Sequence, residues 1–220
     1  MRFVVFDCDG TLVDSQYAVV AATELALSAY NLPIPSRETS LSLMGYPVDF
    51  MMRQHAPDVD TETLNEIVKI YRAEAARLAT LDDRGQVLFP GTMDIINWLS
   101  QQDDVVLGII TMKSGRGLGR VVDVYGLRPF FECLKSADDG PGKPEPDLLL
   151  DAMRQVGALP SETVMIGDTA YDMMMARSAN VYAVGVSWGH QTSDELIDGG
   201  ANEVVETSDR LQDTLKTFLA

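Results

Sequence analysis

The first fifteen residues constrain the fold of this chain more than any other segment. A short apolar run at residues 3–6 is followed at once by Asp7 and Asp9, and then by Gly10 and Thr11. The run is too short for a helix and is typical of a buried strand that ends in a polar turn. In an open α/β sheet the carboxyl ends of parallel strands face the ligand crevice. We therefore expect both carboxylates to project into that crevice and not into the core.

Three more polar signatures follow along the chain. Thr111 comes after the apolar run 107–110, Lys143 stands between a glycine and a proline, and residues 167–172 follow the apolar run 164–166. Taken alone, the first segment fits a plain strand end equally well, because Asp-Gly is a common turn dipeptide. The four signatures together favour one shared site over four unrelated strand ends.

The four signatures resemble the motifs of a known superfamily. They are DxDGT at 7–11, Thr111, Lys143 and GDxxxD at 167–172. In order and spacing they are similar to the motifs of the haloacid dehalogenase superfamily, and within it to the capped phosphatases of subfamily I that include phosphoglycolate phosphatase. The resemblance covers essentially the whole chain. It implies an α/β fold, in which a Rossmann-like doubly wound parallel sheet carries an inserted helical cap.

The second half of the chain alternates between helical and strand-like segments. Such alternation favours a parallel sheet with helices on both faces. Helices are predicted at 92–102, 116–125 and 146–156, and strands at 105–110, 131–135, 163–166 and, as the final strand, 181–186.

Between the first motif and this region lies a segment with a different pattern. Apolar residues recur there at helical spacing, and they include Val20, Leu25, Ala29, Ile67, Tyr71, Ala75 and Leu78. We therefore predict a helical insert at 16–83 within a core domain formed by 1–15 and 84–220. The resemblance implies that this insert is a cap that opens and closes during turnover and selects the substrate.

Composition limits the partners that this protein can have. The chain of 220 residues is 46% hydrophobic and carries a formal charge of −16, which argues against binding to nucleic acid or to an anionic membrane surface. It contains no apolar stretch long enough to span a membrane, so the cytoplasm is the expected location. The two cysteines are expected to be reduced packing residues. A small phosphorylated metabolite remains compatible with the acidity if a metal ion and a lysine reverse the potential locally.

The resemblance assigns chemical roles to four residues. It makes Asp7 the nucleophile that forms an aspartyl-phosphate, and Asp9 the acid that protonates the leaving group and then activates water. Lys143 and the Thr111 hydroxyl would bind phosphate oxygens. Each requirement of phosphoryl transfer therefore has a candidate residue.

The same resemblance predicts a Mg²⁺ site, because Mg²⁺ prefers a few carboxylates together with water and phosphate oxygens. Its ligands would be Asp7, Asp168 and the backbone carbonyl of Asp9. Asp172 would support Lys143 and the metal site, although it could equally be an acid that stabilises a helix N-terminus. The other supporting residues are Gly167 and Thr169.

Contacts to the phosphate are also expected from Thr11 and from the backbone amides of Cys8, Asp9 and Met112. Family members often carry Asn or Gly after the motif threonine, so Met112 removes any side-chain hydrogen bond from that position and leaves only a backbone donor.

Further substrate contacts are predicted on both domains. Lys113 and Arg116 could bind a substrate anion, and Tyr46 in the cap resembles part of a specificity loop. His55 and His190 match none of the motifs.

The function predicted from the sequence is a Mg²⁺-dependent phosphatase for a small phosphomonoester such as 2-phosphoglycolate. A phosphomutase of the β-phosphoglucomutase type would use the same core, and inorganic pyrophosphate is another possible substrate. A haloacid dehalogenase needs no metal and has no use for a second acid at Asp9. A non-catalytic binding module would be expected to have lost a motif residue, and none is lost.

Overall fold

The chain divides into two units. The computed structural model describes residues 1–78 and 87–220. One unit comprises Met1–Val13 and Leu88–Ala220, and the other is Asp14–Val87. The boundary predicted after residue 15 lies two residues beyond the observed division between Val13 and Asp14. The boundary predicted at 83/84 lies outside the described residues. Two short strands, β2 (Val13–Asp14) and β3 (Val87–Leu88), pair with each other where the chain passes between the units.

The larger unit contains a parallel sheet whose strand order places the carboxyl end of β1 at its centre. Within the described residues the sheet has six strands, in the order β5-β4-β1-β6-β7-β8. The strands are β1 (Arg2–Phe6), β4 (Val105–Ile110), β5 (Cys133–Lys135), β6 (Thr163–Gly167), β7 (Tyr182–Val186) and β8 (Glu203–Val205). The chain builds outward from β1 through β4 to β5, and then returns to the other side of β1 with β6. The strand order therefore reverses between β1 and β6, which is where ligands bind in open α/β sheets.

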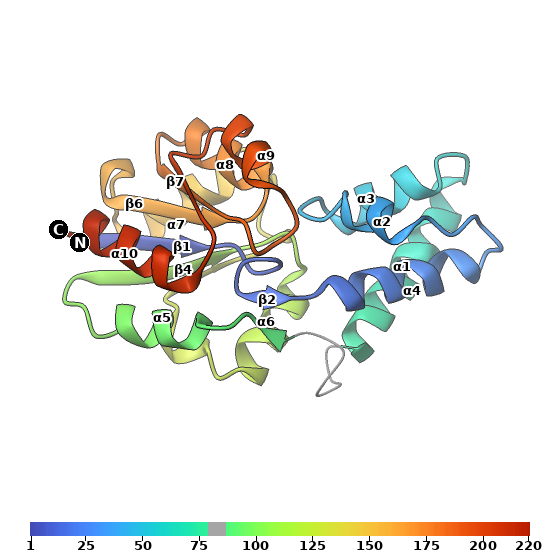
Figure 1. Ribbon diagram of the computed structural model, residues 1–220. Helices are drawn as coiled ribbons and strands as arrows, with labels where there is room; N and C mark the ends of the chain where they lie inside the picture. Colours follow the sequence, from blue (N-terminus) through green and yellow to red (C-terminus); the bar gives the residue numbers. More distant parts are fainter. Residues whose placement is uncertain (79–86) are drawn as a thin grey trace. The chain divides into compact units, whose positions relative to one another are not determined.

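Helices cover both faces of this sheet (Figure 1). Successive side chains of a strand point to opposite faces, so Val4 and Phe6 enter one hydrophobic cluster while Phe3 and Val5 enter another. The first cluster is completed by α5 (Thr92–Leu99), α6 (Gly115–Val124) and α10 (Ser208–Leu219), and the second by α7 (Asp147–Val156), α8 (Ala170–Ser178) and α9 (Ser193–Asp198). Short 3-10 turns occur at Arg128–Phe130 and Pro160–Glu162. The predicted doubly wound α/β core is confirmed.

The smaller unit is helical, as predicted for the insert. It contains α1 (Gln16–Ser28), α2 (Arg37–Leu41), α3 (Val48–His55) and α4 (Thr61–Leu78). Its core includes Leu27, Met52 and Ile67, which are completely buried. The apolar residues predicted on α1 are not its buried face, because Leu25 is 47% exposed. The buried face instead carries small residues such as Ala22, which allow α1 to lie close to α4.

The end of the chain corrects one prediction. The strand predicted at 181–186 is present as β7, but it is not the final strand, because β8 pairs with it in parallel. β8 is only three residues long and forms the edge of the sheet. A strand this short has too few residues to show a pattern in the sequence.

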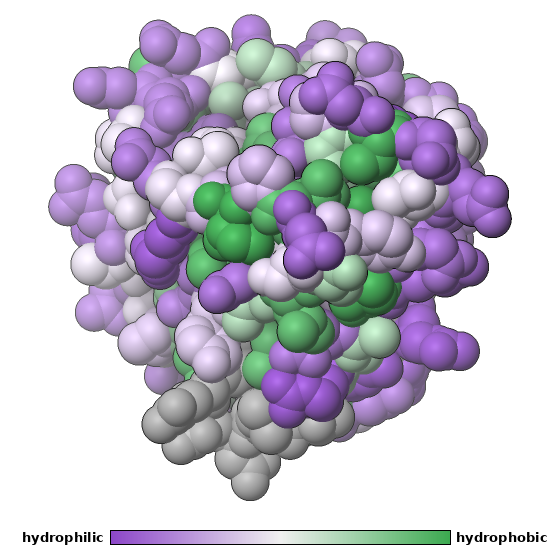
Figure 2. Space-filling view, turned by 90° about the vertical axis from the view of Figure 1, so that its right-hand side faces the viewer, coloured by the Kyte–Doolittle hydropathy of each residue, from purple (hydrophilic) through white to green (hydrophobic). Residues whose placement is uncertain are grey.

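One face of the molecule mixes hydrophilic and hydrophobic residues (Figure 2). Figure 2 shows one face of the molecule, on which a limited number of strongly hydrophobic residues gather among hydrophilic ones. Among the described residues, no helix combines the length and hydrophobicity needed to cross a membrane.

The packing of β1 against β4 leads to a stability prediction. A Cβ added to Gly108 would lie 2.7 Å from a ring atom of Phe3, which is completely buried. Gly108→Ala should therefore lower the free energy of unfolding by about 1–3 kcal/mol, measured by urea denaturation. Gly119→Ala on α6 is the matched control, because the nearest atom to its added Cβ is 3.9 Å away. The control should be neutral or stabilising by up to about 1 kcal/mol, and equal effects of the two changes would contradict the packing argument.

Candidate active site

Three of the four motifs meet at the carboxyl ends of neighbouring strands. Asp7 directly follows β1, Thr111 directly follows β4, and Asp168 directly follows β6. The register aligns Phe6 with Ile109 on one side and with Ile166 on the other, and the amide of Asp7 continues the ladder by donating to Ile166. The sheet therefore holds the backbones of these residues at one height, at the point where the strand order reverses.

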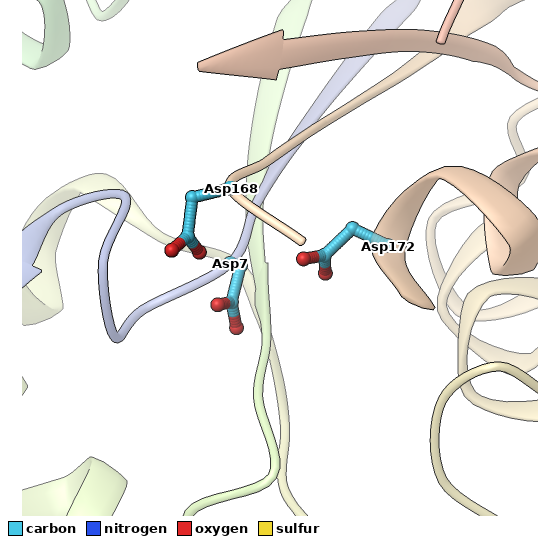
Figure 3. A group of neighbouring side chains, drawn as sticks. All are labelled: Asp7, Asp168 and Asp172. Carbon is cyan, nitrogen blue, oxygen red and sulfur yellow. The ribbon is translucent and has the colours of Figure 1, made fainter. Parts of the chain in front are cut away.

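An acidic cluster lies at this point. Carboxylate oxygens of Asp7, Asp168 and Asp172 lie within 4.8 Å of one another. Figure 3 shows Asp7 and Asp168 side by side after their strands, with Asp172 directed toward Asp7 from the first turn of α8. Asp7 is only 4% exposed, and the other two are completely buried. Carboxyl groups are held this close in a buried site only where cations or bound protons compensate their charge.

Lys143 supplies part of that compensation. Its Nζ lies 2.6 Å from Asp7 Oδ1 and 2.5 Å from Asp172 Oδ1, and its side chain is 1% exposed. Burial lowers the pKa of Lys143, but the two carboxylates outweigh burial and raise it above its ordinary value. The amine is therefore a fixed positive charge between the two aspartates.

Asp172 both pairs with Lys143 and stabilises the N-terminus of α8, the two roles considered for it from the sequence. One oxygen pairs with Lys143, while Oδ2 accepts hydrogen bonds from the amide and the hydroxyl of Thr169 at 3.1 and 2.6 Å. Thr169 in turn caps α8. A Cβ on Gly167 would lie 2.3 Å from the Asp172 carboxyl carbon, so this glycine makes room for the side chain. Gly167, Thr169 and Asp172 thus form one unit that orients Lys143.

The cluster still carries excess negative charge. Burial raises the pKa of Asp7, Asp172 and Asp168 raise it further, and the opposing effect of Lys143 leaves it well above its ordinary value. A divalent cation would relieve this repulsion, and a set of buried carboxylate oxygens suits Mg²⁺. Asp172 is already occupied by Lys143 and Thr169, so Asp7 and Asp168 are the side chains that would hold the ion.

Asp168 is held by residues from two other segments. Its Oδ1 accepts a hydrogen bond from the Thr11 hydroxyl at 3.3 Å, so the side chain of Thr11 contacts the carboxylate. Its Oδ2 accepts from the amide of His190 at 2.9 Å and contacts the ring nitrogen Nδ1 of the same residue. Burial lowers the pKa of His190, but the hydrogen bond and the charge of Asp168 outweigh burial and raise it. His190 follows β7 and lies outside every motif, and no local signal in the sequence placed it here.

Asp9 is paired with Lys113. Lys113 Nζ lies 2.7 Å from Asp9 Oδ1, and the two side chains are 15% and 21% exposed. The amide of Lys113 donates to the Thr111 hydroxyl at 3.2 Å, which leaves the hydroxyl hydrogen available for another acceptor. Lys113 therefore forms an ion pair with Asp9, the residue expected to act as the general acid. The contact of Lys113 with a substrate anion stays a prediction.

Met112 packs against the segment that carries Lys143. A Cβ on Gly142 would lie 2.4 Å from Met112 Sδ, so the thioether rests on the backbone just before Lys143. The side chain that departs from the family pattern thus contacts a second motif.

The remaining predicted residues lie in three different settings. Cys8 is completely buried among apolar residues and burial raises its pKa, as expected for a packing thiol. Arg116 lies exposed on α6. Tyr46 belongs to the helical unit, where its ring stacks on Phe50 at 4.4 Å. The roles of Tyr46 and Arg116 in substrate binding stay predictions.

Comparison with known proteins confirms the family that the sequence resembles. The model of the haloacid dehalogenase-like hydrolases matches residues 4–186. The chain belongs to this family. It is 32% identical over 206 residues to "Probable phosphatase IndB" of Dickeya dadantii, covering 93% of this chain and 89% of that protein. It is 30% identical over 227 residues to the phosphoglycolate phosphatase of Escherichia coli K12, covering 94% and 89%. A solved hydrolase from Pseudomonas syringae superposes with a TM-score of 0.85 at 26% identity, covering 98% of each chain.

The buried ion pairs lead to a prediction on stability. Lys143→Met keeps the length of the side chain but leaves Asp7 and Asp172 without their cation, so it should lower the free energy of unfolding by about 3–5 kcal/mol in chelator. Lys135→Met is the matched control, because Lys135 pairs with Asp151, which is 49% exposed. That change should cost less than about 1 kcal/mol. Equal losses in urea denaturation would contradict the importance of the buried pair.

The charge of the cluster also leads to a prediction on Mg²⁺ binding. Because the pKa of Asp7 is raised, protons should compete with the cation at a higher pH than for an ordinary aspartate. Below that pKa, affinity should fall by about tenfold per pH unit. Calorimetric titration of the free protein with Mg²⁺ from about pH 8 to pH 5 measures this. The Asp7→Asn variant should bind more weakly and with a shallower pH dependence, and an affinity of the native protein that is constant over this range would refute the prediction.

Proposed function

We propose that this protein is a Mg²⁺-dependent phosphatase that hydrolyses a small, phosphoglycolate-like phosphomonoester through an aspartyl-phosphate intermediate. The observation that carries the proposal is the position of Asp7, buried at the strand-order reversal between Lys143 and Asp168. Membership of the hydrolase family and relatives named as phosphatases support it.

The first half of the reaction uses groups from three motifs. Lys143, the Thr111 hydroxyl and backbone amides after β1 hold the phosphate oxygens. One oxygen of Asp7 is paired with Lys143, and the other, Oδ2, attacks phosphorus. The bond from phosphorus to the leaving oxygen breaks, and Asp9 gives that oxygen a proton. A bound Mg²⁺ would screen the repulsion between the carboxylate and the phosphate.

The ion pair with Lys113 bears on this proton transfer. In this structure Lys113 occupies Asp9 Oδ1, whereas the leaving group requires a proton from this carboxyl group. We infer that the arriving phosphate draws Lys113 away from Asp9, after which Asp9 takes up a proton.

The second half regenerates the enzyme. Asp9, now a carboxylate, removes a proton from water, and the water oxygen attacks phosphorus. The bond between phosphorus and Asp7 Oδ2 breaks, which releases inorganic phosphate and restores the Asp7 carboxylate.

The alternatives differ in substrate more than in chemistry. A phosphomutase would return the phosphoryl group to a second hydroxyl of the sugar phosphate, and a pyrophosphatase would accept phosphate as the leaving group. Both would use the same core residues. A dehalogenase is disfavoured, because the pairing of Asp9 with Lys113 and the carboxylate of Asp168 beside Asp7 serve no step of carbon–halogen hydrolysis. The cytoplasmic location and a small phosphorylated metabolite as the partner stay predictions.

Phosphate release from 2-phosphoglycolate, pyrophosphate and a panel of sugar phosphates tests the proposal. We expect Mg²⁺-dependent release from one small monoester, which chelator abolishes and Asp7→Asn reduces to background. Asp9→Asn should lower kcat by about 10²–10⁴-fold, because it removes the proton carrier of both half-reactions.

Asp151→Asn is the matched control, since Asp151 pairs with Lys135 at a partly exposed position, and it should retain native activity. Release that persists in purified Asp7→Asn, or no release from any monoester, would overturn the proposal.

A further inference from the structure

The segment after β7 contacts two catalytic motifs. The indole Nε1 of Trp188 donates to the carbonyl of Thr11 at 3.2 Å, and Gln191 Oε1 accepts from the amide of Ala170 at the start of α8. Between them, His190 contacts Asp168 through its amide and its ring. Residues 188–191 therefore join the loop after β1 to the loop after β6, and we call them the clasp.

The clasp packs closely against Gly10 and Asp168. A Cβ on Gly10 would lie 2.0 Å from Asp168 Oδ2 and 2.3 Å from His190 Nδ1. A Cβ on Gly189 would lie 2.3 Å from the same carboxylate oxygen. Two glycines thus leave room for the imidazole and the carboxylate to meet, and Gly10 has a φ of 81°, which glycine adopts at no steric cost.

The contacts of His190 restrict the orientation of Asp168. The amide and the ring Nδ1 of His190 both reach the same oxygen, Oδ2. Among the described residues Oδ1 accepts one hydrogen bond, from Thr11 at 3.3 Å, so it retains a lone pair for a cation. The side chain of His190 is only 4% exposed, which fixes its ring. A buried ring that is hydrogen-bonded to a metal-binding group usually sets the orientation and basicity of that group.

The second ring nitrogen of His190 has unused hydrogen-bonding capacity. Nε2 of His190 is buried without a hydrogen-bond partner in the described part of the structure. An unsatisfied buried polar atom costs about 1–3 kcal/mol, so it favours a site that gains a partner when it is occupied.

We propose that His190 is a positioning residue of the magnesium site, where it holds Asp168 Oδ2 so that Oδ1 faces the ion. The proposal rests on the Mg²⁺ dependence of the proposed function. It concerns binding of the ion by the free protein, and so it can be tested without a substrate.

The test is calorimetric titration of the 220-residue chain with Mg²⁺ alone. His190→Phe keeps a ring but removes the side-chain donor, and it should weaken Mg²⁺ binding by about 10–100-fold. His190→Asn, which retains an N–H donor, should recover part of this loss. Saturating Mg²⁺ should restore most of the activity of His190→Phe, because the nucleophile and the acid are intact.

His55→Phe is the matched control. His55 also has a buried Nε2 without a partner in the described structure, but it lies at the end of α3 in the helical unit. It should bind Mg²⁺ like the native protein. An affinity of His190→Phe within about twofold of native, in a protein that is folded by circular dichroism, overturns the proposal.

His190→Ala is a second variant in case His190→Phe does not fold. It also removes the ring donor, and its small side chain does not crowd Gly10. If neither His190→Phe nor His190→Ala folds in chelator, the residue serves folding alone and the proposal is wrong. If the native protein binds no Mg²⁺, the proposed function fails first. If it binds Mg²⁺ and hydrolyses nothing, the inference on His190 stands without the phosphatase assignment.

Discussion

The architecture of this site depends on an imbalance of buried charge. Three aspartates meet at the end of the sheet, and one lysine lies between two of them. Burial of like charges costs free energy, which the ion pairs of Lys143 and the packing of the surrounding apolar core offset. We expect the residual negative charge to favour the binding of a divalent cation. The electrostatic cost of folding this cluster and its expected affinity for an ion would then have the same physical origin.

Strand order makes this imbalance possible. Asp7 and Asp168 are far apart in the sequence, yet parallel pairing of β1 with β6 in a fixed register places them beside each other. Lys143 and Asp172 come from the segments before α7 and within α8, which pack on the same face of the sheet. Hydrogen bonding of the sheet backbone therefore sets the distances, whereas side chains such as Thr169 only refine orientation.

Sequence alone predicted the features that have local signatures. Strands such as β4 and helices such as α7 show their own periodicity, and Asp7 directly follows an apolar run. Lys143 and Asp168 stand beside recognisable glycines or prolines. Other features carry no such signal. β8 is too short for a pattern, α1 buries alanines in place of the larger Leu25, and His190 reaches Asp168 only because β7 lies next to β6. Likewise, the pairing of Lys113 with Asp9 depends on three-dimensional proximity, and only the structure reveals it.

The contact between Met112 and Gly142 has a consequence for how this protein can vary. The thioether occupies the space that any side chain at position 142 would need, so the residues allowed at one position depend on the residue at the other. A side chain at 142 therefore requires the end of Met112 to move, and a smaller residue at 112 would remove that requirement. Substitutions at the two positions should be non-additive in their effect on stability, a coupling that changing one motif at a time would miss. The residue after Thr111 and the residue before Lys143 are in this sense one packing unit.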